Sequence, residues 1–160
     1  MPIEAERKVL IENLRQLPGQ LRAALRGLTP AQLTTHFLAN EWTVAQNVHH
    51  LADSHMNAFL RMKLVLTEDH PPVKPYSPDA WAALADGSQL PLEPSLILLD
   101  GLHARMIALL AAVQPEQWER VAVHPENGEI SLDRMLKIYG MHGIAHLKQI
   151  AEALAAAPAS

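Results

Sequence analysis

His142 and His146 are the residues of this sequence whose type and spacing point most directly to chemistry. They stand four positions apart in the run GMHGIAHLKQI, inside a segment with helical periodicity. Residues i and i+4 lie one above the other on a helix, with Cβ atoms about 5–6 Å apart, so two imidazoles can reach one metal ion. The pattern is short, however, and it could equally join two unrelated histidines.

A third imidazole would complete a reactive site, because three neutral imidazoles on one ion leave a coordination position open for water or substrate. The upstream run NVHHLADSH contains His49, His50 and His55. On a helix, His49 points about 100° away from His50, and His55 points about 140° away. We therefore expect that at most one of these three side chains can easily join the late pair.

The helix face around His50 is polar, and it includes Asp53, Asn57 and Arg61. Such a face is either an ordinary solvated surface or the wall of a water-filled site at one end of a bundle. In the second case, Asp53 or Asn57 would be the hydrogen-bond partner of an imidazole ligand. The residues alone leave both interpretations open.

The composition excludes several classes of function. The 160-residue chain contains nine histidines and no cysteine, so disulfides, thiolate ligands and a protein thiol nucleophile are excluded, and thiol chemistry would need an external thiol. A formal net charge of −4 offers no basic stripe for nucleic acid. The acidic, amphipathic start is unlike a signal peptide, and we expect no apolar run that approaches a bilayer span. We predict one cytoplasmic domain over residues 1–160, without a nucleic acid or membrane partner.

Helical periodicity dominates the chain and strand alternation is nearly absent, which predicts an all-α four-helix bundle. The four long helices are expected over about 4–27, over about 44–67 after Thr43 as N-cap, over about 95–113, and from Ser131 as N-cap into the alanine-rich tail. Pro18 should break or kink the first of them, because proline lacks the N–H that a helix interior needs.

Two glycines, Gly140 and Gly143, stand inside the last predicted helix. Each costs about 1 kcal/mol relative to alanine in a helix interior. Either the close approach of a neighbouring backbone or open space beside the late histidines would offset this cost.

The connections are predicted to hold little regular structure. Six prolines between residues 68 and 94 exclude a continuous helix there, although residues 79–84 could form one turn around Trp81. A proline-rich loop of this length, between the second and third long helices, is usually functional or mobile. Short helical turns are expected after Thr29 and over 114–120. The Asn127-Gly128 pair in VAVHPENGEI predicts a hairpin.

A wider pattern runs through three stretches: EWTVAQNVHHLADSHMNAFLRMKLVLTEDHPPVKPYSPDAWAALAD, SLILLDGLHARMIALL and HPENGEISLDRMLKIYGMHGIAHLKQI. It contains a tryptophan before the second long helix, a histidine-leucine pair two turns later, and a late HxxxH. These features are Trp42, His50-Leu51, and His142 with His146. Over about residues 35–152 the chain resembles the DinB-like superfamily, and within it the YfiT type of candidate metal-dependent hydrolase.

The resemblance implies a four-helix bundle that binds one divalent metal through His50, His142 and His146, often as a homodimer. It selects His50 over His49, because the matching family ligand stands directly before leucine. The chain departs from its relatives beside the late pair, where they often carry an aromatic residue or further histidines. Those places hold Met141, Ile144 and Ala145. The departures concern pocket shape and proton relays rather than the ligands themselves.

Other residues are weaker candidates for a role in the site. His124, in the loop HPENGE, could lean over the metal as an acid or base, or it could simply be exposed. Tyr139, one turn before the late pair, could line the pocket or reach water. His55 and His103 are expected to be core or structural histidines, and Trp42 is expected to pack between helices and loops.

Three functional hypotheses follow. In the first, the ion lowers the pKa of bound water to about 7 and the resulting hydroxide attacks a small-molecule carbonyl, which makes the protein a hydrolase. In the second, the ion activates an external low-molecular-weight thiol, as the resemblance implies for some relatives, which makes the protein an S-transferase. In the third, a non-catalytic bundle binds a ligand. Zinc, nickel and iron all accept imidazole, and we expect one divalent ion per chain.

Overall fold

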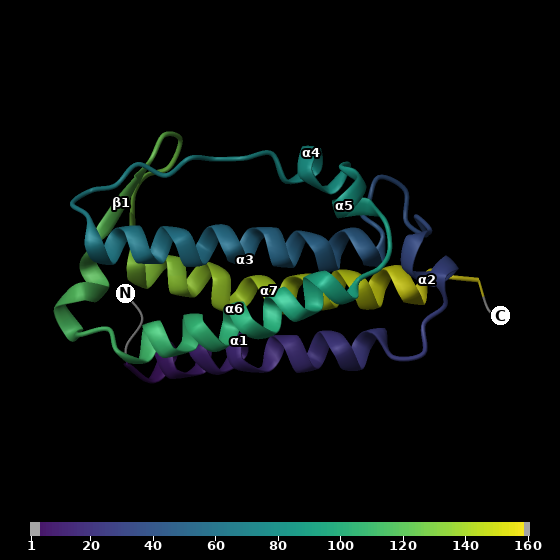
Figure 1. Ribbon diagram of the computed structural model, residues 1–160, viewed down its shortest axis with the longest axis horizontal. Coiled ribbons are helices and arrows are strands. Elements are labelled where there is room, and N and C mark those ends of the chain that lie inside the picture. The colour runs from purple at the N-terminus through teal and green to yellow at the C-terminus, as the bar shows by residue number, and fades with distance from the viewer. Residues whose placement is uncertain (1–3, 159–160) are drawn as a thin grey trace.

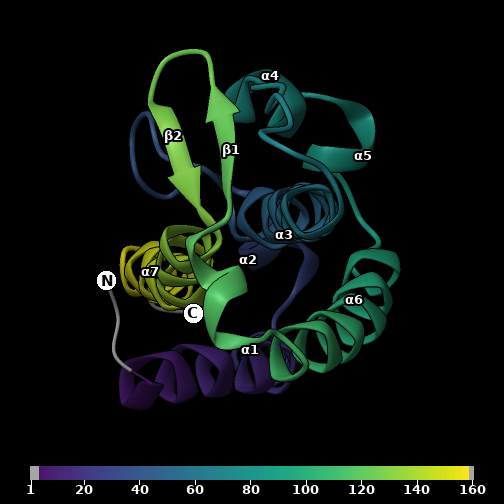
Figure 2. The same cartoon turned by 90° about the vertical axis from the view of Figure 1, so that its left-hand side faces the viewer.

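Four long helices run side by side through the computed structural model, which describes residues 4–158 (Figure 1). They are α1 (Glu4–Leu25), α3 (Val44–Thr67), α6 (Glu93–Ala111) and α7 (Leu132–Ala155). Viewed end-on, α3 and α7 form one side of the bundle, and α1 and α6 form the other (Figure 2). The predicted all-α four-helix bundle is confirmed.

The remaining elements are short and lie mainly over α3 and α7 (Figure 2). They are α2 (Pro30–Thr34), α4 (Pro78–Ala82), α5 (Ala85–Ser88), a 3-10 turn η1 (Pro115–Glu119), and an antiparallel hairpin of β1 (Val121–His124) and β2 (Gly128–Ser131). The long proline-rich loop between α3 and α6 is also confirmed. It contains two short helices instead of one turn, and Pro72 forms a parallel bridge with Val123 of the hairpin. Loop and hairpin therefore form one cover above the bundle.

Side-chain caps determine where α3 and α7 begin. The Thr43 hydroxyl accepts a hydrogen bond from the Gln46 backbone N–H at 3.1 Å, and the Gln46 side chain accepts from the Thr43 N–H at 3.0 Å. Ser131 caps α7 in the same way, with 3.1 Å from its Oγ to the Arg134 N. These bonds satisfy N–H groups that have no partner in the first turn of a helix. Both predicted helix starts are confirmed.

α1 continues through Pro18 as one helix, so the break that the sequence allowed at this proline does not occur. Proline cannot donate to the carbonyl four residues earlier, which is that of Leu14. In this bundle the donor comes from another helix, because Nδ1 of His103 in α6 lies 2.6 Å from the Leu14 oxygen. The missing helical hydrogen bond is thus replaced by a tertiary one.

The glycines of α7 allow α1 to approach closely. A Cβ atom on Gly140 would lie 2.9 Å from Cβ of Leu10 and 3.1 Å from its backbone oxygen, and one on Gly143 would lie 2.5 Å from Cδ2 of Leu17. Real Cβ atoms do not pack at the shortest of these separations. The close-approach alternative is therefore the correct one, and the glycines leave no open space beside the late histidines.

The core consists of two apolar clusters, one toward each end of the bundle. All four long helices contribute to both clusters. On α3, Ala52 belongs to one cluster and Ala58 to the other, and His55 lies between them; on α7, His142 and His146 lie between the two contributions. A buried layer of histidines therefore divides the core near its middle.

α6 requires a correction to one expectation. Within residues 4–158 it is the one helix long and apolar enough, by length and composition alone, to cross a membrane. The expectation that no apolar run approaches a bilayer span is therefore wrong. In the structure α6 packs against α1 and α3, with Leu99 and Met106 fully buried. An apolar composition of this kind also suits a helix in a bundle core.

Candidate metal centre

The structure brings together the three histidines that the resemblance selects. His50 comes from α3, and His142 and His146 come from consecutive turns of α7. Nε2 of His142 lies 3.3 Å from Nε2 of His50 and 3.0 Å from Nε2 of His146. One ligand atom from each of the three residues falls within 4.8 Å of the others. Two helices that are remote in sequence thus present three imidazole nitrogens to one point.

Asn47 determines which nitrogen of His146 carries the proton. The side-chain NH2 of Asn47 donates to the Thr43 carbonyl at 3.0 Å, so its oxygen faces His146 Nδ1 at 2.8 Å. An amide oxygen can only accept, and His146 therefore donates from Nδ1. Its Nε2 keeps a lone pair directed toward the meeting point.

A second set of contacts determines the proton position on His142. His103 Nδ1 contacts the Leu14 carbonyl at 2.6 Å, His103 Nε2 contacts His55 Nδ1 at 2.9 Å, and His55 Nε2 contacts His142 Nδ1 at 3.2 Å. The carbonyl can only accept, so each neutral ring along this line donates from Nδ1 and accepts at Nε2. His142 therefore also presents an Nε2 lone pair to the meeting point.

Burial keeps these rings neutral. Desolvation lowers the pKa of His50 to about 4 and that of His142 to about 3, and it also lowers the pKa of His146. Two lone pairs 3.0 Å apart repel each other unless a cation lies between them. Since burial disfavours an extra proton, a metal ion is the better candidate.

The nitrogen separations fit a divalent metal. Zinc binds imidazole nitrogens at about 2.0–2.1 Å, so two nitrogens on a tetrahedral ion lie about 3.3 Å apart. The observed separations of 3.3 Å and 3.0 Å need little adjustment. The donor set is all imidazole, which suits zinc, nickel and iron rather than calcium or magnesium. These residues therefore fit the metal that the sequence predicts.

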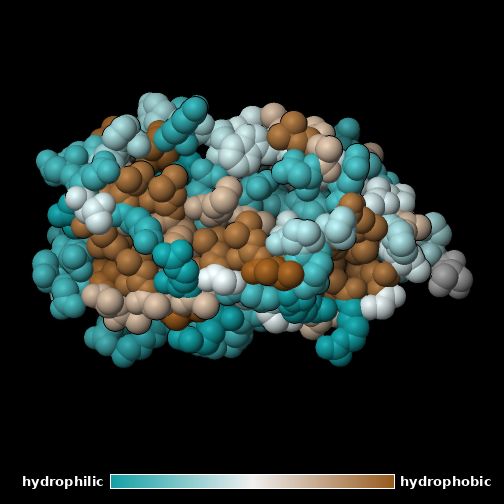
Figure 3. All heavy atoms as spheres, in the orientation of Figure 1, coloured by the Kyte–Doolittle hydropathy of each residue, from teal (hydrophilic) through white to brown (hydrophobic). Residues whose placement is uncertain are grey.

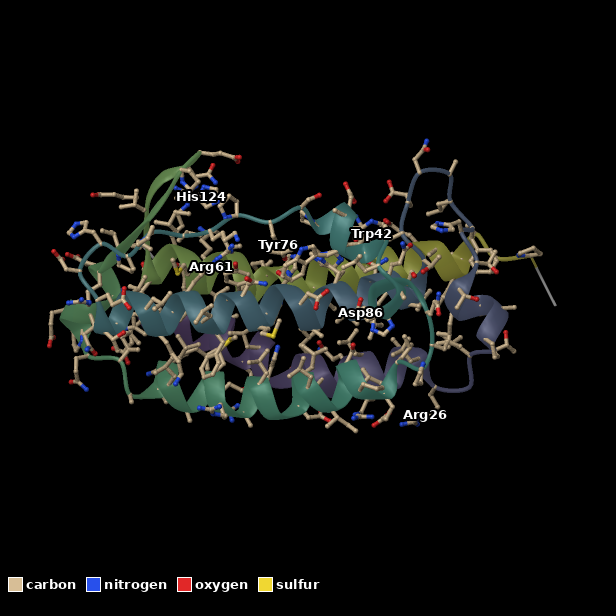
Figure 4. All side chains as sticks on the ribbon, turned by 45° about the horizontal axis from the view of Figure 1, so that its top comes forward. Arg26, Trp42, Arg61, Tyr76, Asp86 and His124 are labelled. Carbon is tan, nitrogen blue, oxygen red and sulfur yellow. The ribbon has the colours of Figure 1, made fainter. Side chains whose placement is uncertain are left out.

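A cavity of about 590 Å³ opens on the three histidines. Figure 4 shows four of its lining residues along the side of the bundle that the loop and hairpin cover: Trp42, Tyr76, Arg61 and His124. The Trp42 ring stacks on His146 with 6.0 Å between centroids, and its Nε1 donates to Asp79 at 3.0 Å. The three histidines thus lie at the floor of a cavity that Trp42 lines on the side of His146.

Tyr139 and Arg61 form a polar pair in this cavity. Arg61 donates from Nη1 to the Tyr139 hydroxyl at 2.8 Å and from Nη2 to the Lys74 carbonyl at 3.0 Å. Tyr139 is only 8% exposed and its ring meets His142 edge-on. The sequence-based alternative in which Tyr139 lines the pocket is therefore correct.

His124 lines the same cavity from the hairpin, as one of its two predicted alternatives requires. Its Nδ1 accepts hydrogen bonds from the backbone N–H groups of Glu126 and Asn127, at 3.2 Å and 3.3 Å. A neutral His124 therefore carries its proton on Nε2. This tautomer is opposite to that of His142.

His49 belongs to different surroundings, although it is adjacent to His50. Its Nδ1 contacts the Ser95 hydroxyl and its Nε2 the Gln89 carbonyl, both at 2.7 Å. It lines a separate cavity of about 340 Å³ together with Asp53. The geometry thus agrees with the choice of His50 over His49.

Two hydrogen-bond partners of the candidate ligands were not predicted from the sequence. Asn47, and not Asp53 or Asn57, is the hydrogen-bond partner of a candidate ligand. As expected, His50 is the one histidine of the three that joins the late pair in the cluster. His55 contacts the other nitrogen of His142, which the sequence did not predict. The sequence places His55 five residues after His50, on another face of the same helix. Which residues that face contacts depends on how the helices pack, and the sequence alone did not show this.

Two curated relatives of this chain carry the same description. A protein of Geobacillus kaustophilus (strain HTA426), named as a candidate metal-dependent hydrolase, is 50% identical over 143 residues, which are 88% of this chain and 80% of the relative. One of Bacillus mycoides (strain KBAB4), with the same description, is 42% identical over 140 residues, with the same two coverages.

Two solved structures share the fold. YfiT from Bacillus subtilis, described as a candidate metal-dependent hydrolase with an unusual four-helix bundle topology, has a TM-score of 0.91 and 38% identity over 96% of this chain and 88% of that one. A mycothiol-dependent maleylpyruvate isomerase has a TM-score of 0.69 and 17% identity over 94% of this chain and 61% of that one. The second likeness concerns the fold alone. A model of the DinB superfamily matches residues 13–150, and this chain therefore belongs to the DinB superfamily.

Proposed function

We propose that this protein is a metal-dependent hydrolase of a small-molecule ester or amide. The observation that supports it best is the pair of Nε2 lone pairs on His142 and His146, 3.0 Å apart, with His50 Nε2 beside them. The names of its relatives support the same class. An arrangement of facing acceptors in a buried place is costly without a cation, and this cost supports a bound ion at the three histidines.

His50, His142 and His146 would hold one divalent ion at the floor of the cavity. Bound there, the ion supplies a Lewis acid that lowers the pKa of a coordinated water to about 7. Zinc, nickel and iron remain the three candidates, and elemental analysis of protein from its native host identifies which one is present.

The other cavity residues would orient the substrate. Arg61 is a permanent cation with unused donors in a partly buried position, which suits a carbonyl or carboxylate oxygen of the substrate. His124 presents an Nε2–H that can donate a hydrogen bond to an oxygen of the substrate. Trp42 offers an apolar wall beside His146. These three residues, from different elements, would determine which small molecules fit.

The test is turnover by purified protein loaded with zinc, nickel or iron in turn. Esters and amides form one panel, and an electrophile offered with a set of low-molecular-weight thiols forms the other. We expect hydrolysis that is lost in His50→Ala and retained in His49→Ala, since His49 lies in a separate cavity. Turnover that requires a thiol would overturn the hydrolase assignment in favour of an S-transferase. Absence of any bound ion would favour a non-catalytic bundle.

A homodimer in the cytoplasm completes the proposal. Exposed apolar side chains lie on α3 and α6, the helices nearest the viewer in Figure 3, where several hydrophobic areas are visible. They include Met56, Leu60, Ile97 and Leu98. Exposed apolar side chains on two neighbouring helices suit contact with a second copy. Sedimentation at several protein concentrations measures the oligomeric state.

A further inference from the structure

A line of hydrogen bonds behind the metal centre passes through all four long helices. It runs from the Leu14 carbonyl in α1 to His103 in α6, His55 in α3 and His142 in α7. His55 is fully buried and His103 is 2% exposed, so no water competes for these bonds. The line reaches His142 on the side opposite its Nε2, the nitrogen that faces the cavity histidines.

The direction of the line is determined at its α1 end. Histidine can donate from either ring nitrogen, so a row of imidazoles has two opposite hydrogen-bond directions of similar energy. A carbonyl at one end removes this choice, because it can only accept. The Leu14 carbonyl is available for this role because Pro18, four residues later, has no N–H to donate to it.

We propose that His103 and His55 are positioning residues that hold His142 in the Nδ1–H tautomer, with its Nε2 lone pair available to the ion, and that the Leu14 carbonyl freed by Pro18 sets this direction. The benefit of this tautomer for metal binding rests on the proposed function. The assignment of the tautomer itself rests only on the hydrogen bonds. A metal-ligating histidine generally donates its other N–H to a fixed acceptor, which orients the ring and makes the ligand more basic. Here that acceptor is another imidazole instead of a carboxylate.

The ring geometry supports a positioning role for His55 and His103, in addition to giving buried polar atoms hydrogen-bond partners. The His55 and His103 rings are parallel within 4° with centroids 4.9 Å apart, and His55 also lies 5.4 Å from His142. Both rings are buried and each contacts one partner at each nitrogen, so each neutral ring has one donor and one acceptor. Neutral rings transmit the donor direction from ring to ring. A protonated ring would have two donors and could not accept from its neighbour, so the line would be interrupted at that ring.

The first test measures tautomers in the metal-free protein at neutral pH. Nitrogen NMR of isotope-labelled histidine distinguishes a protonated ring nitrogen from one with a lone pair. We expect Nδ1–H on His103, His55 and His142. His124 and His49 are internal controls with the opposite tautomer, since Nδ1 of His124 accepts from backbone N–H groups and Nε2 of His49 faces a carbonyl. An Nε2–H tautomer on His142 would overturn the proposal.

The second test compares two substitutions at His55. His55→Gln keeps an acceptor that can face His142, whereas His55→Leu removes it at similar volume. We expect zinc affinity, measured by competition with a chelator, to fall about 10-fold to 100-fold in His55→Leu and to recover substantially in His55→Gln. Equal zinc affinities in His55→Gln and His55→Leu would show that His55 only packs in the core and does not position His142.

The third test acts at a distance, at a residue that does not contact a ligand. His103→Leu should give His142 a mixture of both tautomers and weaken zinc binding, because His55 is then free to turn its donor toward His142. His49→Leu is the matched control: it removes a buried, doubly hydrogen-bonded histidine outside the line. It should leave the His142 tautomer and zinc affinity unchanged. An unchanged His142 tautomer in folded His103→Leu would contradict the proposal.

The two proposals fail in different ways. If the wild-type protein binds no divalent ion, the proposed function is wrong, while the tautomers still decide whether the line sets the direction at His142. If zinc binds tightly but ester and amide substrates are not hydrolysed, the positioning role stands and only the reaction changes.

Discussion

α7 buries polar groups at two places, and it does so in opposite ways. At its first turn, Asp133 is fully buried and pairs with Arg7 of α1 at 2.7 Å, while Arg7 also lies 4.7 Å above the Trp118 ring. Near its middle, His142 joins a network of imidazoles with lowered pKa. The first region is one compensated charge pair, and the second is a set of neutral groups.

The difference indicates what each region is for. Among the described residues, Oδ2 of Asp133 is the one buried side-chain nitrogen or oxygen without a hydrogen-bond partner, so the ion pair tolerates an imperfect arrangement. In the histidine network, His55, His103 and His142 each have contacts at both ring nitrogens, and the facing acceptors occur only where an ion fits. The ion pair therefore joins α1 to α7, whereas the network surrounds the three candidate metal ligands.

Removal of a candidate metal ligand should affect the histidine network without affecting the Asp133 ion pair, and this is the largest expected effect. His146→Ala takes away one of three imidazoles and one of the two facing lone pairs, so we expect loss of the bound ion while the helical circular dichroism of the metal-free protein is kept. Elemental analysis after gel filtration measures occupancy, with His49→Ala as the control that keeps its ion. Full occupancy in His146→Ala would rule out this ligand set.

Arg7→Met should have the opposite outcome. It leaves the buried Asp133 carboxylate without its cation, and we expect a loss of about 2–3 kcal/mol in the free energy of unfolding, below the usual range for buried pairs because Arg7 is partly solvent-exposed. Zinc affinity should not change. Arg15→Met, which removes an exposed pair with Glu12, is the control and should have little effect on urea unfolding. Equal effects of the two variants would contradict a special role for the Asp133 pair.

Acid should weaken the histidine region of the metal-free protein. Burial lowers the pKa of His50 to about 4 and of His142 to about 3 from 6.5, so the unfolded chain binds more protons than the folded one between those values. The free energy of unfolding should therefore fall as the pH drops below 6.5, by at most about 1.4 kcal/mol per pH unit for each such imidazole. Urea titrations across this range measure the slope. A His142→Phe variant should show a shallower one.

Pro18→Ala should have the smallest effect. The new backbone N–H can donate to the Leu14 carbonyl, which His103 then has to share. Weakening of one hydrogen bond at the end of the line should reduce zinc affinity by about twofold to fivefold. Chelator competition measures it, and Pro30→Ala, at the start of α2, is a control outside the line. An increase in zinc affinity would argue against the role given to Pro18.

Local features of the sequence predicted much of the fold. Thr43 and Ser131 located two helix starts because a cap acts on its own first turn, and Asn127-Gly128 located the hairpin because a turn is equally local. Pro18 shows the limit of this reasoning. Its local effect is to remove a helical hydrogen bond, but His103, 89 residues from Leu14, supplies the missing donor.

The sequence by itself determined the four helices and the HxxxH pair on one face of the last helix, because periodicity and spacing act within one element. Resemblance to a family added His50. Only the tertiary structure decided that Asn47 orients His146, that His55 stands behind His142, and that His103 and the Leu14 carbonyl set the direction of the line. These contacts join residues 48 to 99 positions apart, and their directions depend on which carbonyls and amides the packed helices bring within hydrogen-bonding distance.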